Sequence, residues 1–190
     1  KNIFLDTNIW LYLFCPLSSS RDFIVKKYSR AFTFLIRSNN RLYIDITVIS
    51  EFINRYLRLA FNVYVENHDE GKNFDFKRDY RQTDDFKETS RLIALTIKDK
   101  ILKRVLIANS QYMKEDMIGL IGNLESKGID FTDLHIEKLC LENRFILLTD
   151  DGDVKLVDFG IAKLRDAHQQ VTKTGTIAGT AAYMSPEQVT

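Results

Sequence analysis

The sequence predicts an α/β fold, a three-layer sandwich built around a mainly parallel central sheet. Short apolar runs of strand length alternate with longer segments whose apolar residues recur at helical spacing, and these segments are long enough to cross over between parallel strands. Hydrophobic residues make up 45% of the chain and charged residues 28%, so a protein core can form within a soluble domain.

The first third of the chain alternates strand and helix. Residues 2–6 (NIFLD) indicate a short buried strand that ends in a carboxylate, and a loop containing Pro16 follows. Helical spacing of apolar residues predicts a helix over 21–37, and LYIDI at 42–46 indicates a second strand. A long helix follows, over about 47–66.

The remaining elements are mostly helical. Residues 67–85 are polar and predict a loop or an exposed helical excursion. Isoleucine and valine lie four apart over 86–107, which predicts a helix, and further helices are expected over 113–124 and 132–143. FILLT at 145–149 indicates a last buried strand.

Charge, histidine and cysteine content narrow the possible classes of protein. The net charge of +1 gives no global attraction to nucleic acid, so such contact must come from local patches. The three histidines have no metal-ligand spacing, which argues against zinc, and two distant cysteines without a secretion signal indicate reduced thiols. No apolar run approaches the roughly 20 residues that cross a bilayer, and the first segment lacks a cleavage site, so we expect a cytoplasmic protein without a membrane partner.

Four carboxylates stand at places that parallel-sheet geometry can bring together, beyond the carboxyl ends of the strands. Bare carboxylates a few Å apart repel each other, and a divalent cation removes that cost. Mg²⁺ or Mn²⁺ prefers oxygen ligands and activates water for attack on a phosphodiester. An acidic cluster without His or Cys therefore points to phosphodiester hydrolysis. The four residues are Asp6, Glu51, Asp133 and Asp151.

Four sequence elements in this order resemble the signature of the PIN-domain nucleases. They are LDTN at 5–8, SE at 50–51, Asp133, and TDDGDV at 149–154. Asp133 precedes Thr149 by 16 residues (149 − 133), as the third acid of that family precedes its Thr-x-Asp. The resemblance covers about residues 2–153.

This resemblance implies a metal-dependent ribonuclease of PIN-like fold, with the four acids as ligands of the ion. It further implies that Asn8 and Thr149 support them by hydrogen bonding. Asp153 matches the acid of the family's trailing Asp-Phe, although Val154 stands in place of the Phe.

Each acid also has an ordinary structural explanation. Asp6 can be a turn residue after a strand, and Glu51 an early helix acid favoured by the helix dipole. Asp133 can be a first-turn acid, and Asp130 competes with it as a ligand. Only one or two of the three acids after the last strand can face a site, and these are Asp150, Asp151 and Asp153.

Two stretches are candidates for contact with RNA. Residues 73–87 mix basic and aromatic side chains, which suits phosphate contact and base stacking, but their aspartates cancel the charge and a solvated surface explains them equally. The second stretch is a cleaner basic face that also has the ordinary explanation of a solvated helix surface. It consists of Lys98, Lys100, Lys103 and Arg104.

The C-terminal segments VKLVDFGIAKL (154–164) and GTAAYMSPEQ (179–188) resemble the DFG motif and the end of the activation segment of bacterial-type Ser/Thr protein kinases. By position Asp158 is the DFG aspartate. No Gly-rich loop, VAIK-type lysine or HRD loop precedes it, so we expect no kinase activity. The threonines at the position of activation-loop phosphorylation are Thr172, Thr174 and Thr176.

These observations predict a nuclease domain over 1–153 and, over 154–190, an irregular tail that is a truncated kinase fragment and not an independent domain. A recombination, gene fusion or sequence-assembly event at the shared strand and acidic turn explains the join.

The leading hypothesis is a Mg²⁺- or Mn²⁺-dependent endoribonuclease, either the toxin of a toxin–antitoxin pair or an RNA-processing enzyme. Its expected partners are RNA, an antitoxin protein and a second copy of the chain. The alternatives are a catalytically silent module that binds RNA or protein, and an inactive kinase-derived regulatory fragment.

Overall fold

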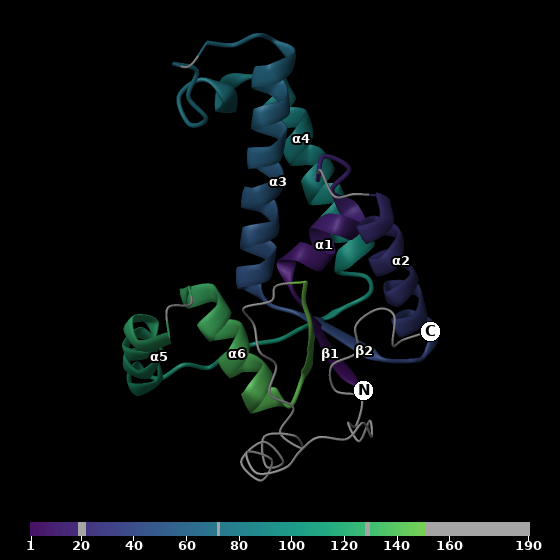
Figure 1. The fold of residues 1–190 in the computed structure, drawn as a ribbon, viewed down its shortest axis with the longest axis vertical. Helices are drawn as coiled ribbons and strands as arrows, with labels where there is room; N and C mark the ends of the chain where they lie inside the picture. Colours follow the sequence, from purple (N-terminus) through teal and green to yellow (C-terminus); the bar gives the residue numbers. More distant parts are fainter. Residues whose placement is uncertain (19–21, 72, 128–129, 151–190) are drawn as a thin grey trace, which may run out of the picture.

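The computed structural model describes residues 1–18, 22–71, 73–127 and 130–150, and it confirms the predicted α/β fold (Figure 1). Within these residues, parallel strands form one sheet in the order β3-β2-β1-β4. Phe4 pairs with Tyr43 on one side and with Leu147 on the other, so β1 is an interior strand. The strands are β1 Asn2–Leu5, β2 Arg41–Ile44, β3 Leu106–Ile107 and β4 Ile146–Leu148.

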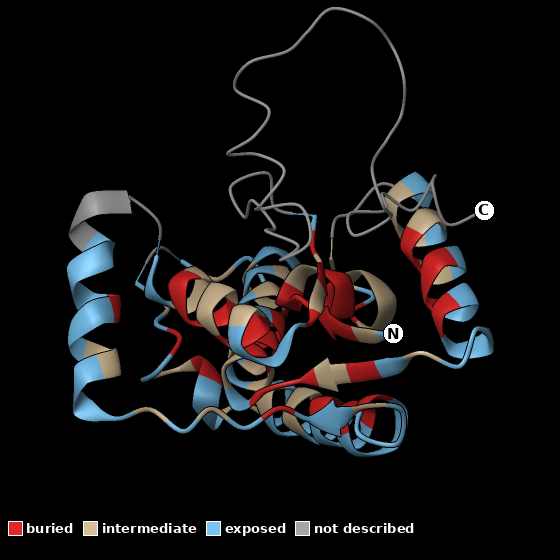
Figure 2. Ribbon diagram, turned by 90° about the horizontal axis from the view of Figure 1, so that it is seen from below, coloured by how far each residue is buried: buried red, intermediate tan, exposed pale blue. Residues whose placement is uncertain are grey.

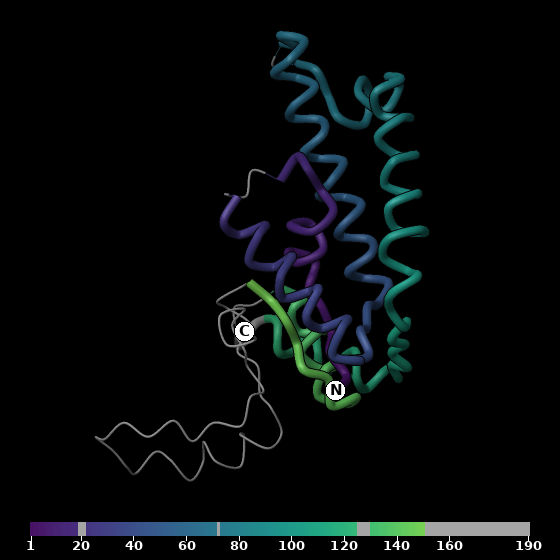
Figure 3. Tube along the Cα trace, turned by 90° about the vertical axis from the view of Figure 1, so that its right-hand side faces the viewer, coloured from purple at the N-terminus to yellow at the C-terminus, as the bar shows by residue number. Residues whose placement is uncertain are grey.

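Helices flank the sheet on both sides, as a three-layer sandwich requires. In Figure 1, α5 and α6 lie to one side of the strands and α1 and α2 to the other. Helices α3 and α4 pack side by side and run away from the sheet as an antiparallel arm (Figures 1 and 3). The helices are α1 Thr7–Phe14, α2 Asp22–Arg37, α3 Ile46–Asn67, the 3₁₀ turn η1 Tyr80–Gln82, α4 Asp84–Leu95, the π-helical η2 Thr96–Ile101, α5 Lys114–Lys127 and α6 Phe131–Asn143.

The core is centred on β1 and the helix that follows it. Phe4, Leu5 and Trp10 are fully buried, and the Trp10 indole N–H donates to the Leu5 carbonyl at 3.2 Å. Buried residues concentrate around the sheet in Figure 2, whereas α5 is exposed along most of its length. The strand ends that carry candidate site residues therefore rest on the buried core.

Helix α1 lies where sequence analysis expected no helix. Most of its side chains are apolar and it packs against both α2 and α3, so no clear amphipathic spacing marks it. Asp6 begins the helix by accepting a hydrogen bond from the Thr7 amide at 2.6 Å. Asp6 is thus both a candidate site residue and the N-cap of α1.

The predicted helix over 86–107 is wrong in its last part. The α-helix ends at Leu95, a π-helical turn continues to Ile101, and Leu106–Ile107 forms β3. Helical spacing persists through Ile93, Ile97 and Ile101 because these side chains are buried in the same core. The following segment then pairs with the edge of β2, and the Ala108 amide donates to the Ile44 carbonyl at 2.8 Å.

The other predicted elements are confirmed to within one or two residues at most boundaries. The stretch 67–85, expected to be a loop or an exposed helical excursion, contains the short turn η1 and the first residues of α4. Both cysteines, Cys15 and Cys140, are buried and free. Among the described helices, none combines the length and apolarity needed to span a membrane. The predictions for the kinase-like tail, 154–190, lie outside the described residues.

Candidate active site

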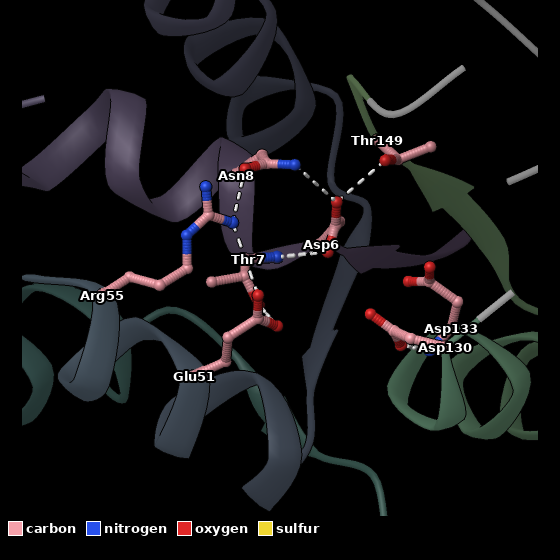
Figure 4. A network of polar contacts seen from close by, with 8 residues as sticks. All are labelled: Asp6, Thr7, Asn8, Glu51, Arg55, Asp130, Asp133 and Thr149. Atoms are coloured by element: carbon pink, nitrogen blue, oxygen red, sulfur yellow. Dashed lines mark hydrogen bonds and ion pairs between the residues drawn. The ribbon is translucent and has the colours of Figure 1, made fainter. Parts of the chain in front are cut away.

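Asp6 lies at the carboxyl end of β1, where polar donors from two elements hold its carboxylate. One oxygen accepts the Thr7 amide at 2.6 Å, and the other accepts the Thr149 hydroxyl at 2.8 Å and the Asn8 amide at 3.5 Å (Figure 4). The Asp6 amide donates to the Leu148 carbonyl at 3.0 Å, which joins β1 to β4. With only 9% of Asp6 exposed, these contacts fix the direction of its carboxylate.

Glu51 lies on α3 and is tied to the segment that follows Asp6. The Thr7 hydroxyl donates to one Glu51 oxygen at 2.8 Å, and Arg55 pairs with the other at 3.4 Å. Arg55 also donates to the Asn8 side-chain carbonyl at 2.7 Å. Residues 6–8 therefore connect Asp6 to Glu51 by hydrogen bonds. Sequence analysis did not identify Thr7 and Arg55 as parts of this connection.

Asp130 and Asp133 stand at the start of α6, across a gap from Asp6. Asp130 is the N-cap of this helix, and one of its oxygens accepts the Asp133 amide at 2.9 Å. In Figure 4 both carboxylates point toward the space that Asp6 and Glu51 border. We call this space, defined by these four carboxylates, the acidic opening. Either aspartate of α6 can supply the third acid.

The acids that border the opening do not form a closed set of ligands. In the parts of the chain that the structure describes, no three His, Cys, Asp or Glu side chains are grouped closely enough to hold a metal. Asp151 and Asp153 lie outside the described residues. The donors present are carboxylate and hydroxyl oxygens, which fit Mg²⁺ or Mn²⁺, and Mg²⁺ keeps several waters and needs only one or two direct carboxylates.

Asp150, one of the three acids after the last strand, is held by two tyrosines. It accepts the Tyr12 hydroxyl at 2.9 Å and also the Tyr28 hydroxyl. Burial, and then the hydrogen bond to Asp150, raises the pKa of Tyr12 to about 12, so this hydroxyl stays a donor at neutral pH. Asp150 is thus attached to α1 and α2.

A buried polar chain links the two sides of the opening. Asp45 follows β2 as Asp6 follows β1, and it caps α3 by accepting the Val48 amide at 3.0 Å. His135 of α6 contacts Asp45 at 2.5 Å through Nε2 and the Tyr112 hydroxyl at 2.6 Å through Nδ1. This chain joins the helix of Glu51 to the helix of Asp133. The strand endings IFLD and LYID are alike, a signal that sequence analysis did not use.

The aromatic residues of 73–87 are used for packing at the end of the α3–α4 arm. Phe76 and Tyr80 are buried, and their rings contact that of Phe61. The Arg58 guanidinium lies 4.1 Å from the Phe76 ring centroid, and the Tyr80 hydroxyl donates to Asp85 at 2.6 Å. These buried rings cannot stack on bases, so the stretch is better explained as a structural cluster.

The basic face on η2 and the residues after it is exposed, as a solvated helix surface is. Lys103 pairs with Asp99 at 2.9 Å, and Arg104 donates to the Lys100 carbonyl at 2.7 Å. Lys103 and Arg104, two of the four basic side chains of this face, therefore already make contacts within their own segment.

A parallel α/β sheet with one strand-end carboxylate and three carboxylates from adjoining helices or their caps around one opening defines a class of domain that includes metal-dependent nucleases. The chain belongs to the PIN domain family, whose model matches residues 3–160. This family generally consists of metal-dependent nucleases. The match includes every candidate site residue between Asp6 and Asp153.

Parts of the chain are similar to protein kinases. The chain is 61% identical over 44 residues to the serine/threonine-protein kinase PknL of Mycobacterium tuberculosis (strain CDC 1551 / Oshkosh), which covers 23% of this chain and 11% of that kinase. It is 58% identical over 43 residues to the serine/threonine-protein kinase PknA of Mycobacterium tuberculosis (strain ATCC 25618 / H37Rv), which covers 23% of this chain and 10% of that kinase. It is 36% identical over 92 residues to the CBL-interacting serine/threonine-protein kinase 20 of Arabidopsis thaliana, covering 48% and 19%.

The chain therefore spans at most a fifth of the length of these curated relatives. The resemblance of the C-terminal segment to a fragment of a Ser/Thr kinase is confirmed. No solved structure matches the chain significantly.

Proposed function

We propose that this chain is an endoribonuclease that hydrolyses RNA phosphodiester bonds with the help of Mg²⁺ or Mn²⁺ bound at the acidic opening. The observation that carries the proposal is the hydrogen-bonded junction at residues 6–8. It orients Asp6 from the end of β1 and holds Glu51 of α3 beside it, within a chain that belongs to the PIN domain family.

In this proposal Asp6, Glu51, Asp133 and Asp151 hold the cation. Thr149 and Asn8 keep the Asp6 oxygens directed. Asp153 is proposed as a further supporting acid. When bound, the ion lowers the pKa of a water molecule and offsets charge that builds on the phosphodiester. The chain's own residues supply orientation: most of the Asp6 carboxylate is shielded from solvent, so its geometry is set before any ligand arrives.

The biological setting is a further part of the proposal. We infer a cytoplasmic toxin of a toxin–antitoxin pair or an RNA-processing enzyme, with an antitoxin protein or a second copy of the chain as partner. We place the boundary of the nuclease domain near residue 153, with 154–190 as a kinase-derived tail that has no phosphoryl-transfer activity.

One observation favours a second candidate, a PIN-like module that binds RNA or protein without cutting it. Asp6, Glu51 and Asp133 are not grouped as ligands of one ion among the described residues. If no cation binds among these acids, the opening has no group that activates water, and the domain binds without cutting. Metal removal separates the two candidates.

We expect the purified chain to cleave a 5′-labelled single-stranded RNA when Mg²⁺ or Mn²⁺ is present and to lose this activity when EDTA is added. The reason is that the site residues alone supply no group that generates hydroxide at neutral pH. Restoring Mn²⁺ in excess over EDTA should restore cleavage. Cleavage that continues undiminished in EDTA contradicts the metal-dependent function, and RNA binding without cleavage in either metal favours the silent module.

A further inference from the structure

We propose that Arg55 binds a phosphate of the RNA at the rim of the acidic opening and so determines how the substrate docks. This inference rests on the ribonuclease function proposed above. Arg55 lies on α3 one turn beyond Glu51, with 46% of its side chain exposed. In Figure 4 its guanidinium lies beside Asn8 and Glu51, next to the opening.

The contacts of Arg55 leave much of its guanidinium available. Nη1 donates to the Asn8 carbonyl oxygen at 2.7 Å and to Glu51 at 3.4 Å. Among the described residues these contacts involve Nη1 alone, so Nε and Nη2 keep N–H groups for a ligand. A guanidinium presents five donors in a planar fork that matches two oxygens of one phosphate.

The negative charge of the acidic opening explains why RNA binding needs a positively charged side chain here. Four carboxylates border the opening, and they repel a phosphate backbone until a cation is bound. The net charge of +1 supplies no long-range attraction. A fixed positive group at the rim offsets this repulsion at the place where a scissile phosphate must approach Asp6.

A purely structural role explains Arg55 poorly. Its ion pair with Glu51 is partly exposed on both sides and 3.4 Å long, and exposed pairs of this kind contribute little to stability. The bond to Asn8 holds the guanidinium beside the LDTN segment. Removing these contacts should therefore change the free energy of unfolding little, and the partly exposed Arg55 side chain can contact a ligand.

The test is RNA binding by the full chain in an Asp6→Asn background, which prevents cleavage from obscuring the equilibrium. Filter binding of a labelled single-stranded RNA is measured over a series of salt concentrations. We expect Arg55→Ala to weaken binding about tenfold and to reduce the slope of log K against log salt by about 0.7, the value for one phosphate contact on a single strand. Arg55→Lys should recover the slope but only part of the affinity, because lysine lacks the bidentate fork.

Arg58→Ala is the matched control, because Arg58 is an exposed arginine on the same helix that stacks on Phe76 instead of facing the opening. It should change neither the affinity nor the slope. The inference is overturned if Arg55→Ala binds like its parent, if Arg58→Ala has the same effect, or if the parent binds no RNA. RNA binding is measured here without cleavage. A wild-type chain that does not cleave RNA would therefore contradict the proposed function, whereas the role of Arg55 is tested separately by the affinity of Arg55→Ala.

Discussion

Replacing Asp6 by Asn should lower the rate of RNA cleavage by about 10³-fold or more while the protein stays folded. The substitution removes a charged oxygen at the strand end where the cation is proposed to bind. Asparagine is an N-cap residue as good as aspartate, so α1 still begins with a hydrogen bond to the Thr7 amide. Its amide group can also donate to the Thr149 hydroxyl, which replaces the present contact.

The rate is measured under single-turnover conditions, and folding by circular dichroism and thermal unfolding. Asp84→Asn is the matched control, because Asp84 is an exposed first-turn acid of α4 that pairs with Lys87. That variant should cleave RNA like the wild type. If Asp6→Asn cuts at an undiminished rate, Asp6 has no part in catalysis and the proposed site is wrong.

Replacing His135 by Leu should lower the free energy of unfolding by about 1–3 kcal/mol, the usual cost of leaving a buried hydrogen-bonding group without its partner. Both side chains of the Asp45–His135 pair are almost completely buried, so Asp45 would be left without its contact to the ring. Urea unfolding followed by circular dichroism gives the value. His68→Leu, at the exposed end of α3, should change stability by less than about 0.5 kcal/mol.

The pH dependence of this pair has a definite sign. Burial raises the pKa of Asp45, but hydrogen bonds from His135 and from the Val48 amide outweigh it and lower the pKa overall. A lowered carboxyl pKa contributes stability above the unfolded value of about 3.9, and this contribution disappears as the pH falls through the folded value. The gap in stability between wild type and His135→Leu should therefore narrow below about pH 4. A gap that widens in acid contradicts this account of the pair.

The strands that carry the site were predictable because their signals are local. Each of β1, β2 and β4 is a short apolar run with a polar residue at its end, and in a parallel sheet such ends meet at one edge. Asp6 and Thr149 were therefore expected on the same edge, and they are in contact at 2.8 Å.

Features that depend on distant packing were not predictable. Helix α1 has no polar face, and β3 consists of only two residues that gain their strand conformation from the free edge of β2. The Asp45–His135 contact joins residues 90 positions apart, so no spacing rule marks it. In the sequence, nothing distinguishes Arg55 from other exposed helix residues. The contact between α3 and the segment after β1 brings it beside Asn8 and Glu51.

The most direct test of the central claim is a Mn²⁺ titration of the full chain followed by electron paramagnetic resonance. The account predicts saturable binding of one or two ions per chain and loss of that binding in the Asp6→Asn variant, since the carboxylate at the end of β1 is proposed to hold the cation. Absence of saturable binding in the wild type, or equal binding in both proteins, would contradict the assignment of the acidic opening as a metal site.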